Sequence, residues 1–273
     1  MTKIRDSNIL ITGGASGIGR LMALKLAKEG GNIIIWDIDD QAMARVEGEL
    51  KNLGGKVKTY HCDVSERQVV YKVAAEVLKE FGRVDILINN AGRVSGKDFL
   101  DIPDEMIEST FRLNALAYFW TIKAFLPKMI EQNRGHVVNL SSAAGIVGVY
   151  RLADYSACKF ANIGMDESLR FELKRKKINV KTTIVCPYYI DTGMFKGVKT
   201  RFPLLLPILN EGKVADRIVW AIKKSRKRVV MPWMVYTVWL LRLLPPFFCD
   251  FMANFFGINN TMDEFVGREG KKI

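Results

Sequence analysis

The segment NILITGGASGIG (Asn8–Gly19) decides the fold of this chain. NILIT is a short apolar run of the kind that forms a buried parallel strand. The glycine-rich turn after it leads into RLMALKLAKEG, whose apolar spacing predicts a helix. Glycines let the backbone approach a ligand closely, and a helix start offers free N–H groups to a diphosphate. Strand, turn and helix in this order predict a dinucleotide site at Gly13, Gly17 and Gly19, although the spacing is GxxxGxG rather than GxGxxG.

A second apolar run, NIIIWD, ends in an acid that lies about twenty residues beyond the glycine turn. A carboxylate at this place can accept hydrogen bonds from both hydroxyls of a ribose and would repel a 2′-phosphate. We therefore expect Asp37 to favour NAD over NADP. Two alternatives stay open. Arg20 directly follows the last glycine and is a candidate partner for the 2′-phosphate of NADP, and Asp37 could be a solvated loop acid.

Two further predicted strands, VKTYHCDV and VDILINNAG, end at the same edge of the sheet. The first would end where an adenine lies, and the second would line a cofactor cleft with small and amide residues. The residues concerned are Asp63, Val64, Asn90, Ala91 and Gly92. With GHVVNLSS and INVKTTIVCP the chain has six predicted strands alternating with helices. This pattern predicts an α/β fold with a doubly wound parallel sheet, Rossmann-like, in a single domain over residues 1–230.

The stretch NLSSAAGIVGVYRLADYSACK (Asn139–Lys159) carries the candidate chemistry. Tyr155 and Lys159 are four residues apart, so a helix would place both side chains on one face. A cation beside a phenol lowers the pKa of the phenol, which can then exchange a proton with an alcohol or a carbonyl. Ser142 could place a second hydroxyl against the same oxygen. The alternative is a surface helix pair, because Tyr-x-x-x-Lys alone is a weak signal.

Asn114 is a polar residue inside a mainly apolar helical stretch, residues 101–135. It could be a hydrogen-bonded core asparagine. It could also mark a helix distortion whose carbonyl holds a water in a proton path.

Taken together, the motifs resemble the short-chain dehydrogenase/reductase family over residues 7 to about 230. They are TGGASGIG, Asp63, NNAG, Asn114, Ser142 and YSACK, in order and at the family's intervals. The resemblance implies Ser142 rather than Ser141 as the catalytic serine and a tetrad of Asn114, Ser142, Tyr155 and Lys159. Tyr155 and Lys159 would also contact the cofactor.

The resemblance implies further cofactor contacts at Ser16, Ile18, Pro187, Ile190 and Thr192. Tyr188 stands where the family usually has glycine and is expected to narrow the pocket. Within the family, IIIWDID and the CPxxxxTGMF stretch look most like the branch of retinol and 17-beta-hydroxysteroid dehydrogenases.

The formal net charge of +12 predicts an anionic partner. The basic run KKSRKR is short and has an apolar flank, so we expect no nucleic acid. The four cysteines are far apart, and no pair has the spacing of metal ligands, so we expect no metal. MTKIRDSNILITGG enters a strand at once, without a signal peptide or a leading membrane helix. We therefore expect a cytoplasmic protein that can lie peripherally on a membrane or lipid surface.

Residues 231–273 read as an apolar and aromatic extension without an uninterrupted run of the roughly 20 residues that span a membrane. Residues 223–258 could be an interfacial anchor on anionic headgroups. The alternative is a substrate lid and subunit interface. A homodimer or homotetramer is expected from the resemblance alone.

The sequence thus predicts an oxidoreductase that transfers a hydride between NAD(H) and an alcohol or ketone of a bulky apolar substrate. Retinoids, steroids and long-chain lipid alcohols are the candidates. The alternative is a cofactor-binding scaffold on a lipid surface, without turnover. A scaffold would not need all four catalytic residues.

Overall fold

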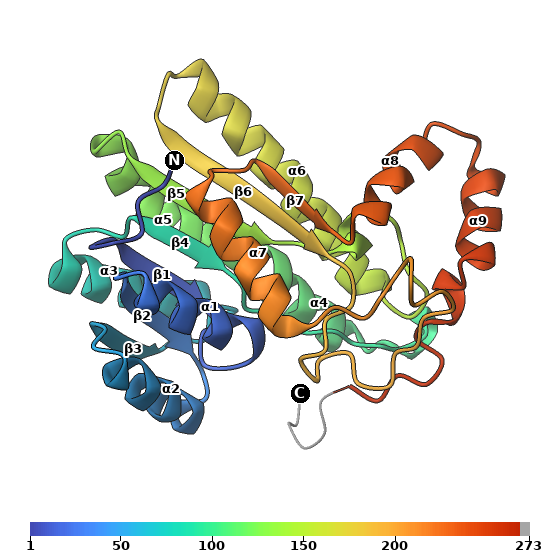
Figure 1. Cartoon of the computed structure of the whole chain (residues 1–273), viewed down its shortest axis with the longest axis horizontal. Coiled ribbons are helices and arrows are strands. Elements are labelled where there is room, and N and C mark those ends of the chain that lie inside the picture. Colours follow the sequence, from blue (N-terminus) through green and yellow to red (C-terminus); the bar gives the residue numbers. More distant parts are fainter. Residues whose placement is uncertain (268–273) are drawn as a thin grey trace.

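The computed structural model describes residues 1–267 and contains one parallel sheet of seven strands with helices on both faces (Figure 1). The strand order is β3-β2-β1-β4-β5-β6-β7. The strands are β1 Asn8–Thr12, β2 Asn32–Asp37, β3 Val57–His61, β4 Ile86–Asn89, β5 Gly135–Leu140, β6 Val180–Pro187 and β7 Arg228–Met231. The predicted α/β fold with a doubly wound parallel sheet is confirmed. The order reverses between β1 and β4, where such sheets bind ligands at the carboxyl ends of the strands.

The main helices form two layers around the sheet (Figure 1). On one face lie α1 Gly17–Lys28, α2 Asp40–Asn52 and α7 Glu211–Lys223. On the other lie α3 Arg67–Phe81, α5 Ala117–Glu131 and α6 Ala153–Arg175, with α4 Asp104–Phe111 against α6.

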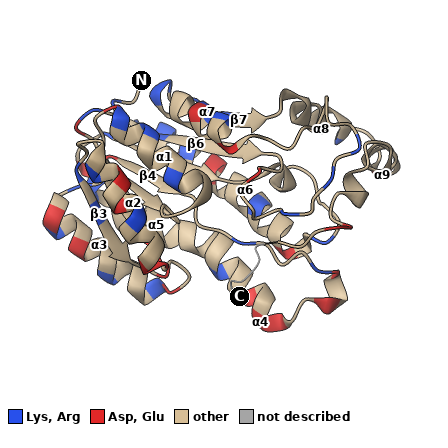
Figure 2. Ribbon diagram, turned by 60° about the horizontal axis from the view of Figure 1, so that its bottom comes forward, with Lys and Arg blue, Asp and Glu red and all other residues tan. Residues whose placement is uncertain are grey.

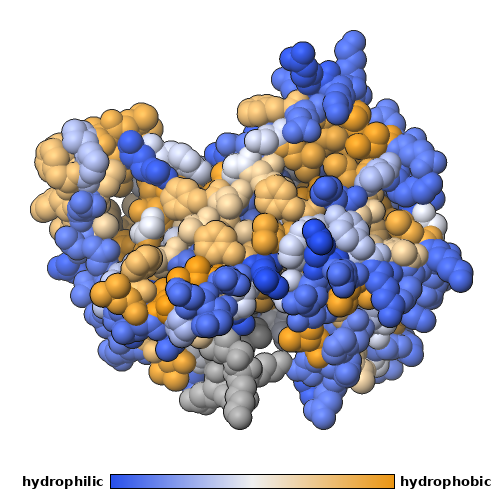
Figure 3. All heavy atoms as spheres, turned by 180° about the vertical axis from the view of Figure 1, so that it is seen from behind, coloured by the Kyte–Doolittle hydropathy of each residue, from blue (hydrophilic) through white to orange (hydrophobic). Residues whose placement is uncertain are grey.

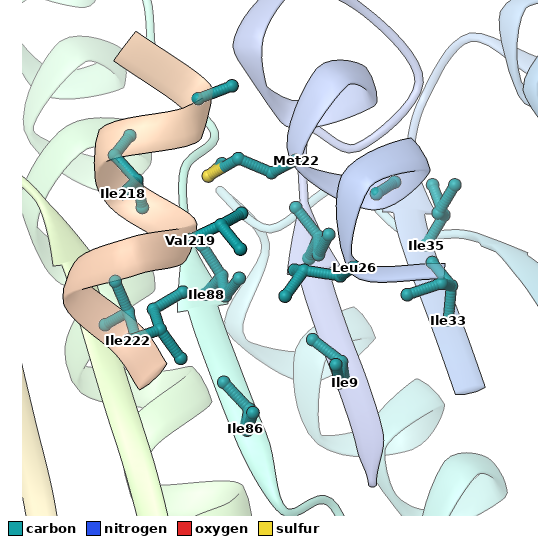
Figure 4. Close-up of a cluster of buried hydrophobic side chains, with 14 of the residues drawn as sticks. Ile9, Met22, Leu26, Ile33, Ile35, Ile86, Ile88, Ile218, Val219 and Ile222 are labelled. Atoms are coloured by element: carbon teal, nitrogen blue, oxygen red, sulfur yellow. The ribbon is translucent and has the colours of Figure 1, made fainter. Parts of the chain in front are cut away.

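The inner strands are apolar on both sides because both faces of the sheet are covered, whereas the edge strand β3 is only partly buried. Figure 4 shows one side of this core, where Ile9 and Ile88 of the sheet meet Met22 of α1 and Ile218 of α7. All four side chains are fully buried. This packing fixes the carboxyl ends of β1 and β4, from which the candidate site is built.

One segment differs from the prediction. Residues 228–231 form β7, which pairs in parallel with β6, whereas the sequence predicts no strand there. The helix predicted within residues 101–135 is divided into α4 and α5 by a π-helical turn at Arg112–Leu116, which is the distortion that one of the two interpretations of Asn114 predicts.

The rest of the C-terminal segment forms two short helices, α8 Thr237–Leu241 and α9 Pro246–Phe255, which project from the body (Figure 1). We call residues 237–255 the α8–α9 lobe. Prolines at 245 and 246 separate the helices, since proline starts a helix readily but cannot continue one. No helix within residues 1–267 is both long and apolar enough to cross a membrane. The expected division at residue 230 falls inside β7 and stays a prediction, and residues 268–273 of the expected extension lie outside the described part.

Candidate active site

The glycine turn after β1 allows a ligand to approach its backbone closely. Gly13 and Gly17 have φ values of +63° and +51°, in the left-handed region that favours glycine. A Cβ on Gly19 would lie 2.2 Å from the carbonyl oxygen of Gly13. Helix α1 begins at Gly17, and its N-cap residue Ser16 makes no side-chain capping hydrogen bond. The first N–H groups of α1, including that of Ile18, therefore suit an anion such as a diphosphate.

The loop after β4 is fastened to this turn by Asn90. Its side-chain amide donates to the carbonyl oxygens of Thr12 and Gly13, at 2.9 and 3.0 Å. The backbone N–H groups of Asn90 and Ala91 donate to the Thr12 hydroxyl. These bonds place Ala91 directly against Gly13, with a distance of 3.0 Å between the Ala91 Cα and a Cβ built on Gly13.

Asp37 lies at the carboxyl end of β2 and reaches the glycine turn, because its Oδ2 accepts a hydrogen bond from the backbone N–H of Ala15 at 3.0 Å. Its Oδ1 accepts from the N–H groups of Ile38 and Asp39. Asp37 is thus anchored and not a freely solvated acid. Arg20, the candidate partner for a phosphate, forms an ion pair with Glu49 instead.

Asp63 and Val64 follow β3 at the same edge of the sheet. Val64 is buried, and Asp63 Oδ1 accepts from both the backbone N–H and the hydroxyl of Ser65. Asp63 therefore shapes the turn before α3, and its second carboxylate oxygen is not used in these bonds.

The predicted reactive trio comes together beyond β5 and β6. Tyr155 lies in the first turn of α6 and is buried, with its ring 6.1 Å from that of Phe195. Its hydroxyl is hydrogen-bonded to the hydroxyl of Ser142. Ser142 also accepts from the N–H of Ala144 and lies 3.4 Å from the carbonyl oxygen of Pro187. Ser141 instead donates to the carbonyl of Lys159, so Ser142 is the serine that faces Tyr155.

Lys159 lies one helical turn after Tyr155 and is also buried. Its Nζ donates to the carbonyl oxygen of Leu140 at 2.8 Å and lies 5.4 Å from the centroid of the Tyr155 ring. Burial lowers the pKa of Lys159 to about 8. The ammonium is thus held below the ring without a carboxylate partner among the contacts described.

The pKa of Tyr155 differs from the expectation. Burial raises it above its usual value, and the hydrogen bond with Ser142 offsets only part of this rise. We expected Lys159 to lower this pKa. In the protein the ammonium is directed at the Leu140 carbonyl, so the loss of solvation around the phenol dominates.

Asn114 lies in the π-helical turn, so the predicted distortion is present. Its side chain is fully buried and forms two hydrogen bonds with the backbone of Arg93, which hold the NNAG loop. The backbone carbonyl oxygen of Asn114 accepts a hydrogen bond from the side-chain amide of Asn162 at 2.8 Å. Gly92 is required beside it, because a Cβ there would lie 2.6 Å from Asn114 Oδ1. The water expected at the Asn114 carbonyl stays a prediction.

Pro187 ends β6, and the segment after it forms one wall of the site. Ile190 is buried and bridges to Leu209, and the N–H of Thr192 donates to the carbonyl of Ile190. Tyr188 lines the neighbouring cavity, with its ring 4.6 Å from that of Tyr189. Tyr188 therefore lies beside the site, in the wall of the cavity that the sequence predicts it to narrow.

An apolar cavity opens beside Ser142. It contains about 960 Å³ of space free of protein atoms, part of it open to solvent. Its lining comes from the loop after β5, the segment after β6, the turn Trp233–Tyr236, the inner side of the α8–α9 lobe and the residues just after the lobe. The lobe contributes Val238, Leu241, Met252 and Ala253. Arg242, at the rim, is held by the carbonyl of Ile146 at 2.7 Å.

Sequence reasoning missed two residues of the site. Asn162 holds the carbonyl of Asn114, and the hydroxyl of Tyr118 lies against Lys159. Tyr118 stands four residues after Asn114 and could have been found as a second polar side chain on the same helix face.

Comparison with known proteins agrees with this geometry. The family model described as short chain dehydrogenase matches residues 7–201. Bovine short-chain dehydrogenase/reductase family 16C member 6 is 46% identical over 96% of this chain and 84% of that protein. Human epidermal retinol dehydrogenase 2 is 45% identical over 96% of this chain and 86% of that protein.

Two solved structures share the fold. A short-chain dehydrogenase/reductase from Burkholderia phymatum in complex with NAD has a TM-score of 0.81 and 27% identity, over 89% of this chain and 95% of that chain. A metagenomic short-chain oxidoreductase in complex with NADP has a TM-score of 0.70 and 26% identity, over 84% and 96%. The predicted family, and the likeness to its retinol dehydrogenases, are confirmed.

Proposed function

Because this chain belongs to the short-chain dehydrogenase/reductase family, we propose that it transfers a hydride between NAD(H) and an alcohol or ketone of a bulky apolar substrate. One observation carries the proposal: Ser142, hydrogen-bonded to Tyr155, lines an apolar cavity. An apolar cavity of this kind suits a bulky apolar substrate, whose reacting oxygen would meet the Ser142 hydroxyl at the cavity wall.

We assign the chemistry to four residues. Tyr155 exchanges a proton with the substrate oxygen, and Ser142 positions that oxygen by a hydrogen bond. Lys159 supplies a positive charge close to Tyr155, which favours the phenolate when the proton leaves. Asn114 holds the loop after β4 and, through its carbonyl, sustains the proton path. Bound NAD supplies the hydride acceptor and, in its oxidised form, a positive charge of its own.

The cofactor is assigned to the edge of the sheet where β1 and β4 end. The glycine turn and the start of α1 suit the diphosphate, and the acids after β2 and β3 suit the adenosine. The loops after β4 and β6, with Tyr155 and Lys159, suit the nicotinamide and its ribose. The residues are Gly13, Ser16, Gly17, Ile18, Gly19, Asp37, Asp63, Val64, Asn90, Ala91, Gly92, Tyr155, Lys159, Pro187, Ile190 and Thr192.

Two contacts support NAD over NADP. The Asp37 carboxylate is fixed at the glycine turn, where it would repel a 2′-phosphate. Arg20, which could bind that phosphate, is engaged by Glu49. The similar solved structures carry NAD in one case and NADP in the other, so the preference needs its own measurement.

Two observations support the substrate class: the apolar lining of the cavity and the name of a similar human protein. The described lining of the cavity is apolar and aromatic except for the hydroxyls and the rim residue Arg242. The human relative at 45% identity is named a retinol dehydrogenase. Retinoids are therefore the first candidates, followed by steroids and long-chain alcohols.

The proposal is tested by hydride transfer to NAD and NADP from retinol, a steroid alcohol, a long-chain alcohol and ethanol. We expect NAD reduction with at least one bulky alcohol, a kcat/KM at least about tenfold lower with NADP, and little turnover of ethanol. NADH binding without any turnover across the panel would instead favour the cofactor-binding scaffold. Equal rates with ethanol would contradict the assignment of the cavity.

We further propose that the α8–α9 lobe lies on a membrane surface. Its outer side exposes large apolar residues, with Leu243, Phe247 and Phe251 at 81%, 63% and 63% exposure. Figure 3 shows this lobe as a largely orange projection, and Figure 2 shows α8 and α9 mostly without charged residues. Leu204, almost fully exposed, belongs to a neighbouring segment that packs on α9 through Phe202 and Phe255.

Charge supports a lipid surface as the partner. Arg228, the first residue of β7, lies 4.7 Å from the centroid of the Trp239 ring in α8, and Arg242 lies within the lobe. Basic groups beside an apolar projection suit anionic headgroups above an acyl layer. Because the inner side of the lobe lines the cavity, an apolar substrate could enter directly from the lipid. A homodimer or homotetramer stays a prediction.

Replacing Phe247 and Phe251 together with serine should reduce binding to phosphatidylcholine–phosphatidylserine vesicles more than tenfold, because each ring contributes about 1.5–3 kcal/mol when fully buried. Vesicle co-sedimentation measures the effect. The matched control replaces Phe99 and Phe171, which are 69% and 59% exposed but lie outside the lobe, with serine. Equal losses in both double variants would rule out docking through the lobe.

A further inference from the structure

Tyr118 of α5 lies beneath the candidate active site and contacts Lys159. Its hydroxyl donates to the carbonyl oxygen of Leu140 at 2.9 Å, and the same carbonyl accepts from Lys159 Nζ at 2.8 Å. Nζ also lies 3.5 Å from the Tyr118 hydroxyl and 5.3 Å from the centroid of its ring. The phenol, the ammonium and the carbonyl therefore form a closed triangle.

The orientation of the Tyr118 hydroxyl is fixed by this triangle. Its proton points at the Leu140 carbonyl, so the lone pairs of its oxygen face the ammonium of Lys159. Tyr118 is 1% exposed, and burial raises its pKa well above the usual value, so it stays a neutral phenol. Tyr118 thus presents a fixed dipole, and the face of its ring, to a buried cation.

We propose that Tyr118 is a positioning residue for the reaction: together with the Leu140 carbonyl, its hydroxyl fixes the Lys159 ammonium below Tyr155. This rests on the proposed function, in which Lys159 supports proton exchange at Tyr155. An ammonium has three N–H donors. Two point at Leu140 and Tyr118, which leaves the third for an acceptor on the side of the cofactor and Tyr155.

The surroundings of Lys159 make these two acceptors important. The titratable groups that face it are Tyr118 from α5, Tyr155 and Cys158 from α6, and Cys186 from β6. Burial raises the pKa of each, so all four are neutral near pH 7. Within the described contacts only neutral oxygens and aromatic faces stabilise the charge of Lys159. They do not offset its burial, which lowers its pKa to about 8. Removing one oxygen should lower it further, since hydrogen bonds to the charged form favour that form.

The test is Tyr118→Phe, which keeps the ring in its apolar cluster and removes only the hydroxyl. Lys159 is titrated in the cofactor-free protein by NMR of ¹³Cε-labelled lysine, with Lys159→Met identifying the resonance. We expect its pKa to fall by roughly half to one unit, since the 3.5 Å contact is at the long end for a hydrogen bond. The high-pH limb of kcat/KM should move down by the same amount, because Lys159 then loses its proton at lower pH.

Tyr60→Phe is the matched control, because it also removes a tyrosine hydroxyl, one bonded to Glu80 away from the site. It should leave the Lys159 titration and the pH profile unchanged. An unchanged Lys159 pKa in Tyr118→Phe would overturn the proposal, as would a loss of activity with an unmoved pH limb, which indicates a structural role only. The titration needs no turnover, so failure of the proposed function would leave its outcome readable.

Discussion

Tyr155→Phe should lower turnover of the bulky alcohol by a factor on the order of 10²–10⁴, the usual contribution of a general acid or base. The ring packs against Phe195 within an apolar cluster, and phenylalanine fills the same space. The fold and the glycine turn are untouched, so NADH affinity should change less than about threefold. Steady-state kinetics and NADH fluorescence titration measure the two effects.

Tyr189→Phe is the control for this variant. Tyr189 is also buried, lines the cavity beside Ser142 and loses a hydroxyl that is bonded to Thr261. Its removal should cost less than about tenfold in kcat/KM, within the range for an uncharged hydrogen bond. Full activity of Tyr155→Phe would contradict the assigned mechanism, and loss of NADH binding would show that the hydroxyl is a main cofactor contact and not only the proton carrier.

The second large effect is expected from Gly19→Ala. The added Cβ would lie 2.2 Å from the Gly13 carbonyl oxygen and 2.7 Å from the Asn90 amide nitrogen. The first of these is backbone, which cannot rotate away, so α1 must move and the bonds that join the glycine turn to the loop after β4 must break. We expect NADH affinity to fall more than 100-fold and stability to fall by about 1–3 kcal/mol, as for overpacking.

Gly48→Ala is the matched control, because Gly48 lies within α2 and a Cβ there would meet nothing within 4 Å. Alanine is the better helix former, so this variant should gain roughly 0.5–1 kcal/mol. NADH titration and urea unfolding distinguish the pair. Wild-type cofactor affinity in Gly19→Ala would disprove the assignment of the diphosphate to this turn.

Strong local patterns made most of the fold predictable. Buried strands such as NIIIWD contain an unbroken run of apolar residues, Ile33 to Trp36, and the glycine turn follows β1 directly. β7 was missed because it has only four residues and lies between a basic run and an apolar one. Its strand character comes from pairing with β6, a contact that the local sequence does not carry.

The relative placement of Tyr155 and Lys159 was predictable from the sequence, but the electrostatics of the candidate site were not. The spacing of Tyr155 and Lys159 correctly placed both side chains on one face of α6. It could not tell that Leu140 and Tyr118, from other elements, would take the hydrogen bonds of the ammonium. Nor could it tell that burial would raise the pKa of Tyr155, because tertiary packing alone decides how far the phenol is buried.

The attachment of the α8–α9 lobe has a consequence for how such proteins diversify. The lobe follows directly on β7, whose last residue, Met231, pairs with Pro187 at the end of β6. One wall of the cavity is therefore formed by a segment that follows the edge strand β7, whereas the glycine turn and α6 belong to the main body of the fold. Substitutions on the inner side of the lobe can therefore change which substrates the cavity admits while the residues that handle the proton keep their places.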